Sequence, residues 1–375
     1  MLHQDTDGTE RDTEYGFEEI SMTSVCYILS YHDPNYIRTR TLVSALQKID
    51  GIQLHQARNS SKGIGRYFET LWKLIAIRLS KKIDFYILGF RGYELFWPVR
   101  IITLGKPLIY DHMMSPYDSL LNERKSIKKG SLIEKLVYLY EKSILHHSNI
   151  VLTDTDIHKK YFQELFNVNS QKILAIPVGA DEALFHIDNA QRLDKPATFE
   201  ILFYGTFLPL HGIDVILGAA SRLRDDRIHF TLIGSNKSNR YYQMIKQAAL
   251  DNVTSSEWIA FEDLPQLIDR VDIGLCGPFG NTGQARRVIT GKTFQFLAMA
   301  KPVIVGEFVG DHGFEDKVNC LVVPQGNEKA LAEAIDWAFH HKTEIEQIGR
   351  QGYELYQSHY SIKQISEKLK KVFTP

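Results

Sequence analysis

The sequence predicts an α/β fold with two domains, each built around a parallel sheet that is covered by helices on both faces. The first observation is size, because 375 residues with 44% apolar side chains are enough for two hydrophobic cores. The second is that short apolar runs alternate with longer amphipathic stretches, which is typical of buried parallel strands separated by helices. The third is the polar segment 186–197, which contains a proline, lacks periodicity and separates two halves of similar size.

The expected elements follow this alternation along the chain. In the first half, strands are predicted at 24–30, 53–55, 85–90, 107–111, 150–153 and 172–177, and helices at 38–48, 67–81, 132–145 and 157–166. In the second half, strands are predicted at 200–204, 229–233, 273–275, 302–305 and 321–324, and helices at 212–223, 241–250, 292–299 and over most of 328–373. A ligand is expected in the cleft between the two domains, at the carboxyl ends of the strands.

These elements divide the chain into five parts. Four of these parts are an N-terminal Rossmann-like domain over 23–185, a linker over 186–197, a C-terminal domain over 198–355 and a final helix over 356–375 that can pack back on the N-terminal domain. The fifth part is the N-terminal segment. Residues 1–22 are acidic and polar and lack the apolar segment of a signal peptide, so a disordered extension is expected there.

Composition excludes some classes of protein. The formal net charge of −1 argues against a dedicated nucleic-acid binder, which carries a large basic excess. No apolar run reaches the roughly 20 residues that a membrane span needs. Cys26, Cys276 and Cys320 lie far apart in apolar runs, without the spacing of a metal site, which predicts buried, reduced thiols in a cytoplasmic protein.

A glycine-containing turn follows the strand predicted at 200–204 and leads into a helix. Gly205 lets the backbone approach a ligand closely, and the helix after Gly212 offers free N–H groups and a positive dipole end to an anion. His211 can add a hydrogen-bond donor or a charge. Any strand-to-helix turn of a parallel sheet tolerates glycine, so this turn alone leaves a purely structural role open.

A second candidate anion site lies just before the helix predicted at 292–299. Arg286, Arg287 and Lys292 flank a loop that contains Gly291. Three cations at a helix start suit a diphosphate, because the helix dipole already favours negative charge there. The alternative is a basic loop that is simply solvated.

Several segments together point to one family. They are ILFYGTFLPLHGID (201–214), FTLIGS (230–235), LPQLIDRVDIGL (264–275), RRVITGKTFQFLAMAKPVIVGE (286–307) and NCLVVPQGNEKALAEAI (319–335), with VLTDTDIHKKYF (151–162) and KILAIPVGADEALF (172–185) in the first half. Their order and spacing resemble the retaining glycosyltransferases of family 4, which have the GT-B fold. The resemblance implies two facing Rossmann-like domains, an interdomain cleft, and a nucleoside-diphosphate sugar that is bound without a metal or a cofactor.

The resemblance also assigns donor-binding residues in the turns of the second half. The family's glycine-rich turn matches Gly205–Gly212, with Thr206 and His211 where the family usually has an arginine and a lysine. Gly234 follows the next strand of this domain. Backbone groups around Phe261 are expected to recognise the edge of the nucleotide base.

Two positions depart from the family's Glu-x7-Glu pattern. Arg287 stands where the first glutamate lies near the sugar, and Gln295 stands where the second binds the ribose hydroxyls. Gln295 can still form hydrogen bonds with a diol, whereas Arg287 reverses the charge. The diphosphate is therefore expected on Arg287, Lys292 and His211, beside the close approach that Gly291 allows.

Candidate residues for catalysis and for the acceptor come from the first half. Asp111 and His112 end the strand predicted at 107–111, where the family has a residue that touches the donor sugar or the reacting hydroxyl. One of this pair is expected to be catalytic, and a hydrogen-bonded structural residue is the alternative. The loop 113–119 after them is expected to be mobile.

The turn after the first strand is expected on the acceptor side. Tyr31, Asp33 and Arg38 lie there and could meet the acceptor or the diphosphate. For Arg38, a surface position on the following helix is the alternative.

Two stretches combine apolar and basic residues. Their basic residues are Lys73, Arg78, Lys81 and Lys82 within 67–82, and Lys125, Lys128 and Lys129 before the helix predicted at 132–145. Such stretches can lie on an anionic membrane surface, which would fit a lipid-linked acceptor on the inner face of a membrane. A core-facing helix with a solvated basic face is the alternative.

The predicted function is transfer of a hexose-like unit from a nucleoside-diphosphate sugar to a glycan or glycolipid hydroxyl in polysaccharide biosynthesis, with retention at the anomeric carbon and without metal. One alternative is a catalytically silent subunit that only binds the nucleotide sugar. Another is a sugar-nucleotide epimerase, which would carry carboxylates around the cleft. A dinucleotide-dependent oxidoreductase is disfavoured, because no GxGxxG follows the strand predicted at 24–30.

Overall fold

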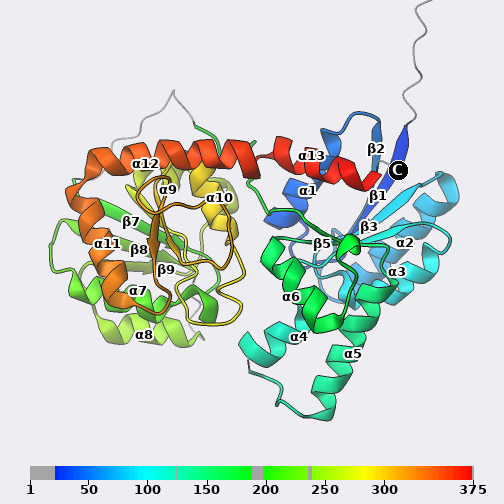
Figure 1. Ribbon diagram of the computed structural model, residues 1–375, viewed down its shortest axis with the longest axis horizontal. Helices are drawn as coiled ribbons and strands as arrows, with labels where there is room; N and C mark the ends of the chain where they lie inside the picture. Colours follow the sequence, from blue (N-terminus) through cyan, green and yellow to red (C-terminus); the bar gives the residue numbers. More distant parts are fainter. Residues whose placement is uncertain (1–21, 124, 188–196, 235–238, 374–375) are drawn as a thin grey trace, which may run out of the picture.

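Two α/β domains make up the protein in the computed structural model, which describes residues 22–123, 125–187, 197–234 and 239–373 (Figure 1). The predicted disordered extension, apart from Met22, and most of the predicted linker lie outside the described residues. No helix in the described part of the chain is long and apolar enough to cross a bilayer.

Each domain contains a parallel sheet of six strands, in the order β2-β1-β3-β4-β5-β6 and the order β12-β11-β10-β7-β8-β9. The strands are β1 (Thr23–Leu29), β2 (Ile52–Arg58), β3 (Phe85–Leu88), β4 (Leu108–Asp111), β5 (Ile150–Thr153), β6 (Ile173–Ala175), β7 (Phe199–Tyr204), β8 (Ile228–Ile233), β9 (Val253–Ser256), β10 (Ile273–Leu275), β11 (Val303–Gly306) and β12 (Leu321–Val323). The order of connection reverses between β1 and β3 and between β7 and β10. In parallel sheets, ligands bind beyond the carboxyl ends of the strands at such reversals.

The helices alternate with these strands as predicted. They are α1 (Ile37–Gln47), α2 (Gly65–Ser80), α3 (Phe96–Ile102), α4 (Pro116–Asp118), α5 (Leu132–His147), α6 (Asp156–Phe166), α7 (Ile213–Arg222), α8 (Arg240–Ala248), α9 (Leu264–Arg270), α10 (Gly291–Ala298), α11 (Glu328–His340), α12 (Lys342–Leu355) and α13 (Ile362–Phe373). Each of the predicted strands and helices has a counterpart in the structure, which confirms the two parallel α/β sheets. The sequence missed β9, whose four residues are mostly polar, and the short helices α3, α4 and α9.

Helices cover both faces of each sheet, as continuous apolar strands require. In the N-terminal domain, α1 and α13 pack on one face, and α2, α3, α5 and α6 pack on the other (Figure 1). In the C-terminal domain, α7, α8 and α11 share one core, and α9 and α10 share the second. The three cysteines are buried and unpaired, as the sequence predicted.

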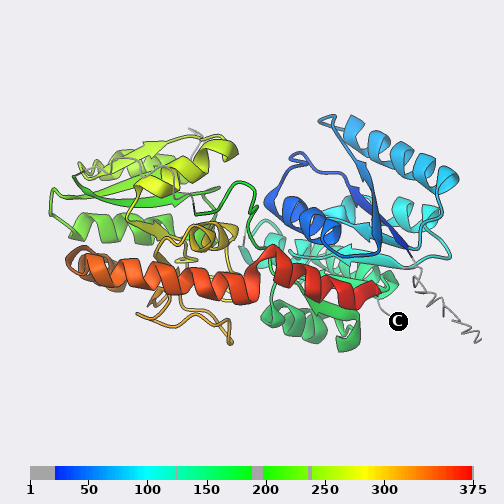
Figure 2. The ribbon, with the colours of Figure 1, turned by 90° about the horizontal axis from the view of Figure 1, so that it is seen from above.

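The end of the chain crosses from one domain to the other. Figure 2 shows α12 on the C-terminal domain and α13 continuing onto the N-terminal domain. A π-helical turn, Tyr356–Tyr360, joins the two helices. Glu182 anchors this crossing, since its Oε1 accepts hydrogen bonds from Tyr356 Oη over 3.1 Å and from the backbone N–H of Ile362 over 2.7 Å.

We expect Leu369→Ala in α13 to destabilise the N-terminal domain by about 2–5 kcal/mol, the usual cost of truncating a buried leucine. Leu369 is 1% exposed and shares a core with Leu42 of α1 and Val25 of β1. Native-state hydrogen exchange at the amides of α1 and β1 measures the loss. Glu367→Ala, an exposed change in the same helix, should shift the free energy by less than about 0.5 kcal/mol. Unchanged protection of α1 and β1 in Leu369→Ala would show that α13 does not stabilise this domain.

Candidate functional site

The end of β7 opens a small polar space in the C-terminal domain. Gly205 follows this strand with a φ of +136°, which side-chain-bearing residues rarely adopt. A Cβ built on Gly205 would lie 3.5 Å from Lys292 Cε and 3.8 Å from both Lys292 Nζ and His211 Cε1. The absence of a side chain at Gly205 therefore keeps free the space in front of a lysine and a histidine.

Two helices begin beside this space. Gly212 has a φ of +65° and is the residue from which α7 starts, and Thr290 precedes α10 in the same way. Neither helix has a side-chain cap on its first N–H groups, so these donors are available to an anion. Strands β7 and β10, which lead to these two helices, flank the reversal in the sheet.

Lys292 is a buried cation without a carboxylate partner among the described residues. It is 5% exposed, and its Nζ lies 4.6 Å from the centroid of the Phe203 ring. Burial lowers the pKa of Lys292 to about 8, and the nearby Cys276 thiol raises it only in part. Lys292 is also the second residue of α10, where the helix dipole opposes a positive charge. A ligand anion at Gly205 would offset all of these costs.

His211 contributes a hydrogen-bonding group and not a charge. Burial and the charge of Lys292 lower the pKa of His211 well below its usual range, so the imidazole is neutral at pH 7. Its Nδ1 is buried and has no hydrogen-bond partner in the described part of the chain. Of the two roles that the sequence left open for His211, the structure favours the neutral one.

The other predicted residues of this domain surround the same space. A Cβ on Gly234, at the end of β8, would lie 2.1 Å from Gly205 O, so the absence of a side chain lets the two turns touch. Thr206 is exposed beside Gly205. A Cβ on Gly291 would lie 3.5 Å from Ile37 Cγ2, which shows that α10 begins against α1 of the N-terminal domain.

Gln295 faces Tyr204 below this space. Tyr204 Oη donates a hydrogen bond of 2.6 Å to Gln295 Oε1, and Gln295 is 4% exposed. Burial raises the pKa of Tyr204 well above its usual range, so the phenol keeps its proton. The amide oxygen of Gln295 therefore has a partner within the protein, and its NH₂ group is the donor that a ribose could meet.

Arg287 contacts the N-terminal domain, and its expected contact with a diphosphate stays a prediction. Its Nη2 lies 2.5 Å from Asp118 Oδ2 in the N-terminal domain, and its guanidinium carbon lies 4.0 Å from the centroid of the Tyr161 ring. Thr155 Oγ1 also donates to the carbonyl of Arg287 over 2.9 Å. In this structure the charge of Arg287 is neutralised by Asp118 across the domain interface.

The loop 113–119, which was predicted to be mobile, is folded. It carries the contact of Asp118 with Arg287 at the domain interface. Ser115 caps α4 by accepting a 3.0 Å hydrogen bond from the N–H of Asp118. The π-helical turn after α4 ends at Glu123, whose Oε1 accepts from the N–H of Leu210 in the C-terminal domain over 2.8 Å. Burial raises the pKa of Glu123, although the hydrogen bonds that it accepts oppose this shift.

Arg38 and Asp111 form a buried ion pair. Arg38 Nη2 lies 2.9 Å from Asp111 Oδ1, and the exposed fractions of the two residues are 0% and 1%. Arg38 Nη1 donates to the carbonyls of Ile176 and Pro177 over 2.6 and 2.9 Å. The pair ties α1 to the ends of β4 and β6. This placement excludes a surface position for Arg38, and a contact of either side chain with a ligand stays a prediction.

His112 is buried and oriented by a carboxylate. Its Nε2 lies 3.0 Å from Glu141 Oε1, and Glu141 Oε2 accepts a 2.7 Å hydrogen bond from the N–H of Tyr117. The Nδ1 atom of His112 has no hydrogen-bond partner among the residues that the structure describes. A catalytic role of His112 stays a prediction.

Tyr31 and Asp33 lie in the loop between β1 and α1. The ring of Tyr31 packs edge-on against Phe90, with centroids 5.2 Å apart, and against Tyr36, with centroids 5.8 Å apart. Asp33 is exposed, and its Oδ1 accepts a 3.1 Å hydrogen bond from the N–H of Asn35. Their acceptor role stays a prediction.

Phe261 lies in the contact between the domains. Its ring packs edge-on against Phe185, with centroids 5.3 Å apart, and the Arg40 guanidinium lies 4.9 Å from its centroid. Arg40 also pairs with Asp181 and Glu262 at 3.1 and 3.4 Å. Recognition of a base near Phe261 stays a prediction.

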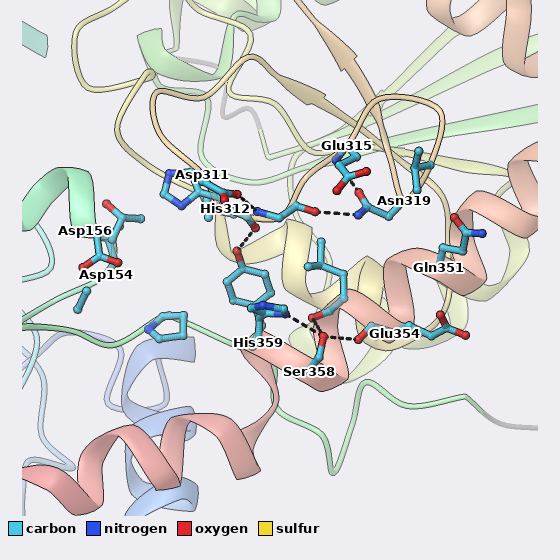
Figure 3. A pocket seen from close by; sticks show the side chains of 18 of the residues that line it. Asp154, Asp156, Asp311, His312, Glu315, Asn319, Gln351, Glu354, Ser358 and His359 are labelled. Atoms are coloured by element: carbon cyan, nitrogen blue, oxygen red, sulfur yellow. Dashed lines mark hydrogen bonds between the residues drawn. The ribbon is translucent and has the colours of Figure 1, made fainter.

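A polar cavity of about 780 Å³ lies between the domains beside the α12–α13 connection (Figure 3). The start of α6, the loop after β11 and the end of α12 line it, and its acidic residues are Asp154, Asp156, Asp311, Glu315 and Glu354. None of the site residues predicted from the sequence lines this cavity. Its carboxylates would repel a diphosphate, so the space at Gly205 and Lys292 is the better anion site.

Comparison with known proteins finds a family that is similar to the second domain. Residues 198–341 match the model of the family described as glycosyl transferases group 1. The C-terminal domain is therefore similar to the glycosyl transferases of group 1. One curated relative is WcaI of Escherichia coli (strain K12), whose name gives it a proposed role as a glycosyl transferase of colanic acid biosynthesis. The two are 25% identical over 187 residues, which span 47% of this chain and 45% of WcaI, or about half of each protein.

Solved structures share the whole fold of the chain. HepE of Anabaena, solved in complex with UDP-glucose, has a TM-score of 0.71 at 12% identity and covers 93% of this chain and 99% of its own. Sucrose-phosphate synthase from Thermosynechococcus elongatus has a TM-score of 0.73 at 17% identity, with coverage of 94% and 98%. At these identities the likeness establishes the fold, and it confirms the GT-B architecture that the sequence predicted.

We expect Lys292→Met to stabilise the ligand-free protein at pH 7. Because burial lowers the pKa of Lys292 from 10.5 to about 8, the charge costs the folded protein about 3 kcal/mol below pH 8. The cost fades as the pH rises from 8 to 10.5, where lysine loses its proton in both states, so the advantage of the variant should shrink over that range. Urea midpoints between pH 7 and pH 10 measure it, with the exposed Lys363→Met as control. A difference that does not change with pH would contradict a charged and unpaired Lys292.

We expect Arg38→Met to lower the free energy of unfolding by about 3–5 kcal/mol, because it leaves the charge of Asp111 buried without a partner. The double variant Arg38→Met/Asp111→Leu should recover most of this loss, since it removes both charges. Thermal unfolding of the three proteins measures the effect. If the single variant were as stable as the unmodified protein, the pair would not be a structural clamp.

Proposed function

We propose that this protein is a glycosyltransferase that moves a hexose-like unit from a nucleoside-diphosphate sugar to a hydroxyl of a glycan or glycolipid. The proposal includes retention at the anomeric carbon, as in family 4, and binding without a metal. The observation that carries it is Lys292 at the start of α10, which is buried in front of Gly205 and has no carboxylate partner among the described residues. A diphosphate would supply the negative charge that these groups lack.

Each group at the site has a proposed role in the reaction. Lys292, His211 and the free N–H groups of α7 and α10 hold the diphosphate. They stabilise the charge that grows on it as the bond to the sugar breaks. The NH₂ group of Gln295 donates to the ribose, and backbone groups near Phe261 meet the base. His112 lies at the end of β4, where it would orient the sugar or the incoming hydroxyl.

The interface contacts support a closed cleft during the reaction. The Asp118–Arg287 pair and the Glu123–Leu210 hydrogen bond join the two domains on one side, and Arg40 joins Glu262 near the linker. Such closure would exclude water, which otherwise hydrolyses the donor. Arg287 would thus act on the site through domain closure and not by contact with the phosphates.

The relatives suggest the class of donor and of product. HepE was solved with UDP-glucose and with UDP, so a uridine diphosphate sugar is the first donor to test. WcaI is named for colanic acid biosynthesis, which favours a polysaccharide or its lipid-linked precursor as acceptor. A cytoplasmic location, where nucleotide sugars are available, accompanies this proposal.

One structural observation favours a second function, a catalytically silent subunit that binds a nucleotide sugar. The two residues at the Glu-x7-Glu positions both have partners within the protein, Arg287 with Asp118 and Gln295 with Tyr204. Neither supplies a carboxylate to the sugar. Nucleotide binding without donor turnover would decide for the silent subunit.

We expect UDP, GDP or ADP to raise the thermal unfolding temperature, because a ligand that binds only the folded state stabilises it. Lys292→Ala should weaken this binding by about 10- to 100-fold, the value of a charge-assisted contact. Arg287→Ala should change it by less than about threefold, since Asp118 already pairs with that side chain. Isothermal titration measures the affinities, and Lys246→Ala, an exposed lysine of α8, is the control.

Two outcomes would contradict the site assignment. One is failure of all three nucleotides to bind, and the other is unchanged affinity in Lys292→Ala. With the preferred nucleotide known, nuclear magnetic resonance of the transferred sugar reports its anomeric configuration, and a chelator tests for metal dependence.

A further inference from the structure

Three neighbouring helices of the N-terminal domain expose an unusual amount of apolar surface. Of 17 large apolar side chains that are exposed in the described residues, 12 belong to α2, α3, α5 or the residues next to them. We call these 12 side chains the apolar face, and they are Ile64, Phe68, Trp72, Ile75, Leu79, Ile101, Leu104, Leu132, Ile133, Leu136, Leu139 and Tyr140. The remaining five are scattered over the rest of the described chain.

The spacing of the exposed apolar side chains along α2 and α5 shows that they form stripes on these helices. In α2, Phe68, Trp72, Ile75 and Leu79 recur at the spacing of one helix face, with 72%, 73%, 38% and 83% of each exposed. The opposite side of α2 buries Leu74 in the core of the domain. The helix is therefore apolar on two sides, although only one of them meets the sheet.

Direct contacts place the three helices side by side. Arg78 of α2 donates to the carbonyl of Leu104, just after α3, over 2.9 Å. Tyr140 of α5 donates to the carbonyl of Tyr93, just before α3, over 2.7 Å. All three helices cover the same face of the sheet (Figure 1), so their outer sides belong to one surface of the protein.

The segments that carry the apolar face are strongly basic. Residues 64–106 and 125–147 contain 13 Lys and Arg against five Asp and Glu, a net charge of +8, whereas the whole chain has a net charge of −1. All five acidic residues have partners in the protein: Glu69 with Lys73, Asp84 with Lys106, Glu94 with Arg66, Glu134 with Tyr117, and Glu141, which is buried beside His112. The charge that surrounds the apolar face is therefore positive.

We propose that the apolar face docks on a lipid bilayer whose headgroups are anionic, with Phe68, Trp72 and Leu79 inserted below the headgroups. Aromatic and aliphatic side chains gain by burial at the interface, and the flanking lysines attract the negative surface. Long lysine side chains can keep their charge at headgroup level while their stems cover apolar surface. A protein partner would need to match both the apolar stripe and a charge of this size, whereas an anionic membrane supplies both.

Flotation of the full chain with vesicles tests this proposal. Vesicles of phosphatidylcholine with 30% phosphatidylglycerol should carry the protein, and pure phosphatidylcholine should carry much less. The double variant Phe68→Ser/Trp72→Ser should lower the partition coefficient at least tenfold. Trp258→Ser is the matched control, because Trp258 is 77% exposed on the C-terminal domain and should not matter.

Charge and depth of insertion are tested separately. Lys81→Glu/Lys82→Glu should weaken binding to the anionic vesicles, and Lys160→Glu/Lys329→Glu, at positions with side chains 73% and 74% exposed, should not. With Trp97, Trp258 and Trp337 replaced by Phe, the fluorescence of Trp72 should shift to the blue when anionic vesicles are added and be quenched by brominated lipid tails. Equal binding of the Phe68/Trp72 variant and the unmodified protein would overturn the proposal.

A second copy of the chain could cover the apolar face in place of a membrane. If analytical ultracentrifugation shows a dimer that Phe68→Ser/Trp72→Ser dissociates, and vesicles do not bind, a second copy of the chain covers this face and the membrane proposal is wrong. The inference does not rest on the proposed function. Nucleotide binding of the same variants, measured without vesicles, should be unchanged, so failure of one proposal is distinguishable from failure of the other.

Discussion

The buried charge of Lys292 organises the C-terminal side of the cleft. A lysine that is 5% exposed normally requires a carboxylate nearby, yet its charged end faces Gly205, Phe203 and a neutral His211. The start of α10 adds the positive end of a helix dipole to the same place. Such an arrangement destabilises the empty protein and is offset when an anion binds, which is a common feature of binding sites.

Two other cations of this protein, Arg38 and Arg287, have their charge neutralised by a carboxylate. Arg38 is completely enclosed and pairs with Asp111, and Arg287 pairs with Asp118. The first pair fastens α1 to the sheet, and the second fastens one domain to the other. Charge neutralisation therefore separates these two cations from Lys292, which has no carboxylate partner in the part of the chain that the structure describes.

The N-terminal and C-terminal domains carry different proposed binding surfaces. The C-terminal domain holds the anion site, and the N-terminal domain carries the apolar face on α2, α3 and α5. The crossing of α12 and α13 and the contacts of Asp118 and Glu123 couple the two domains. A protein held on a bilayer by its N-terminal domain would take a soluble donor on one side of the cleft and a lipid-linked acceptor on the other.

Much of the fold was predictable because parallel strands have a strong local signature. Continuous apolar runs such as 24–30 and 200–204 gave eleven of the strands, and the missing strand β9 is short, polar and at the edge of its sheet. The short helices α3, α4 and α9 were missed, since three to seven residues hold too little periodicity to recognise. Gly205, His211 and Lys292 were also found from the sequence, because glycine turns and helix starts place their groups locally.

Which charged side chains form ion pairs was decided only by the tertiary structure. Asp118 and Arg287 lie 169 residues apart, and Arg38 and Asp111 lie 73 apart, so no local pattern reveals that they are paired. The sequence therefore determined the fold class, and it predicted an anion site at the strand ends. The tertiary structure decided that Lys292 is the unneutralised cation, that Arg287 belongs to the interface, and that the outer sides of three helices form one apolar face. The physical reason is that residue types set local conformation and polarity, whereas pairing and exposure depend on contacts between distant parts of the chain.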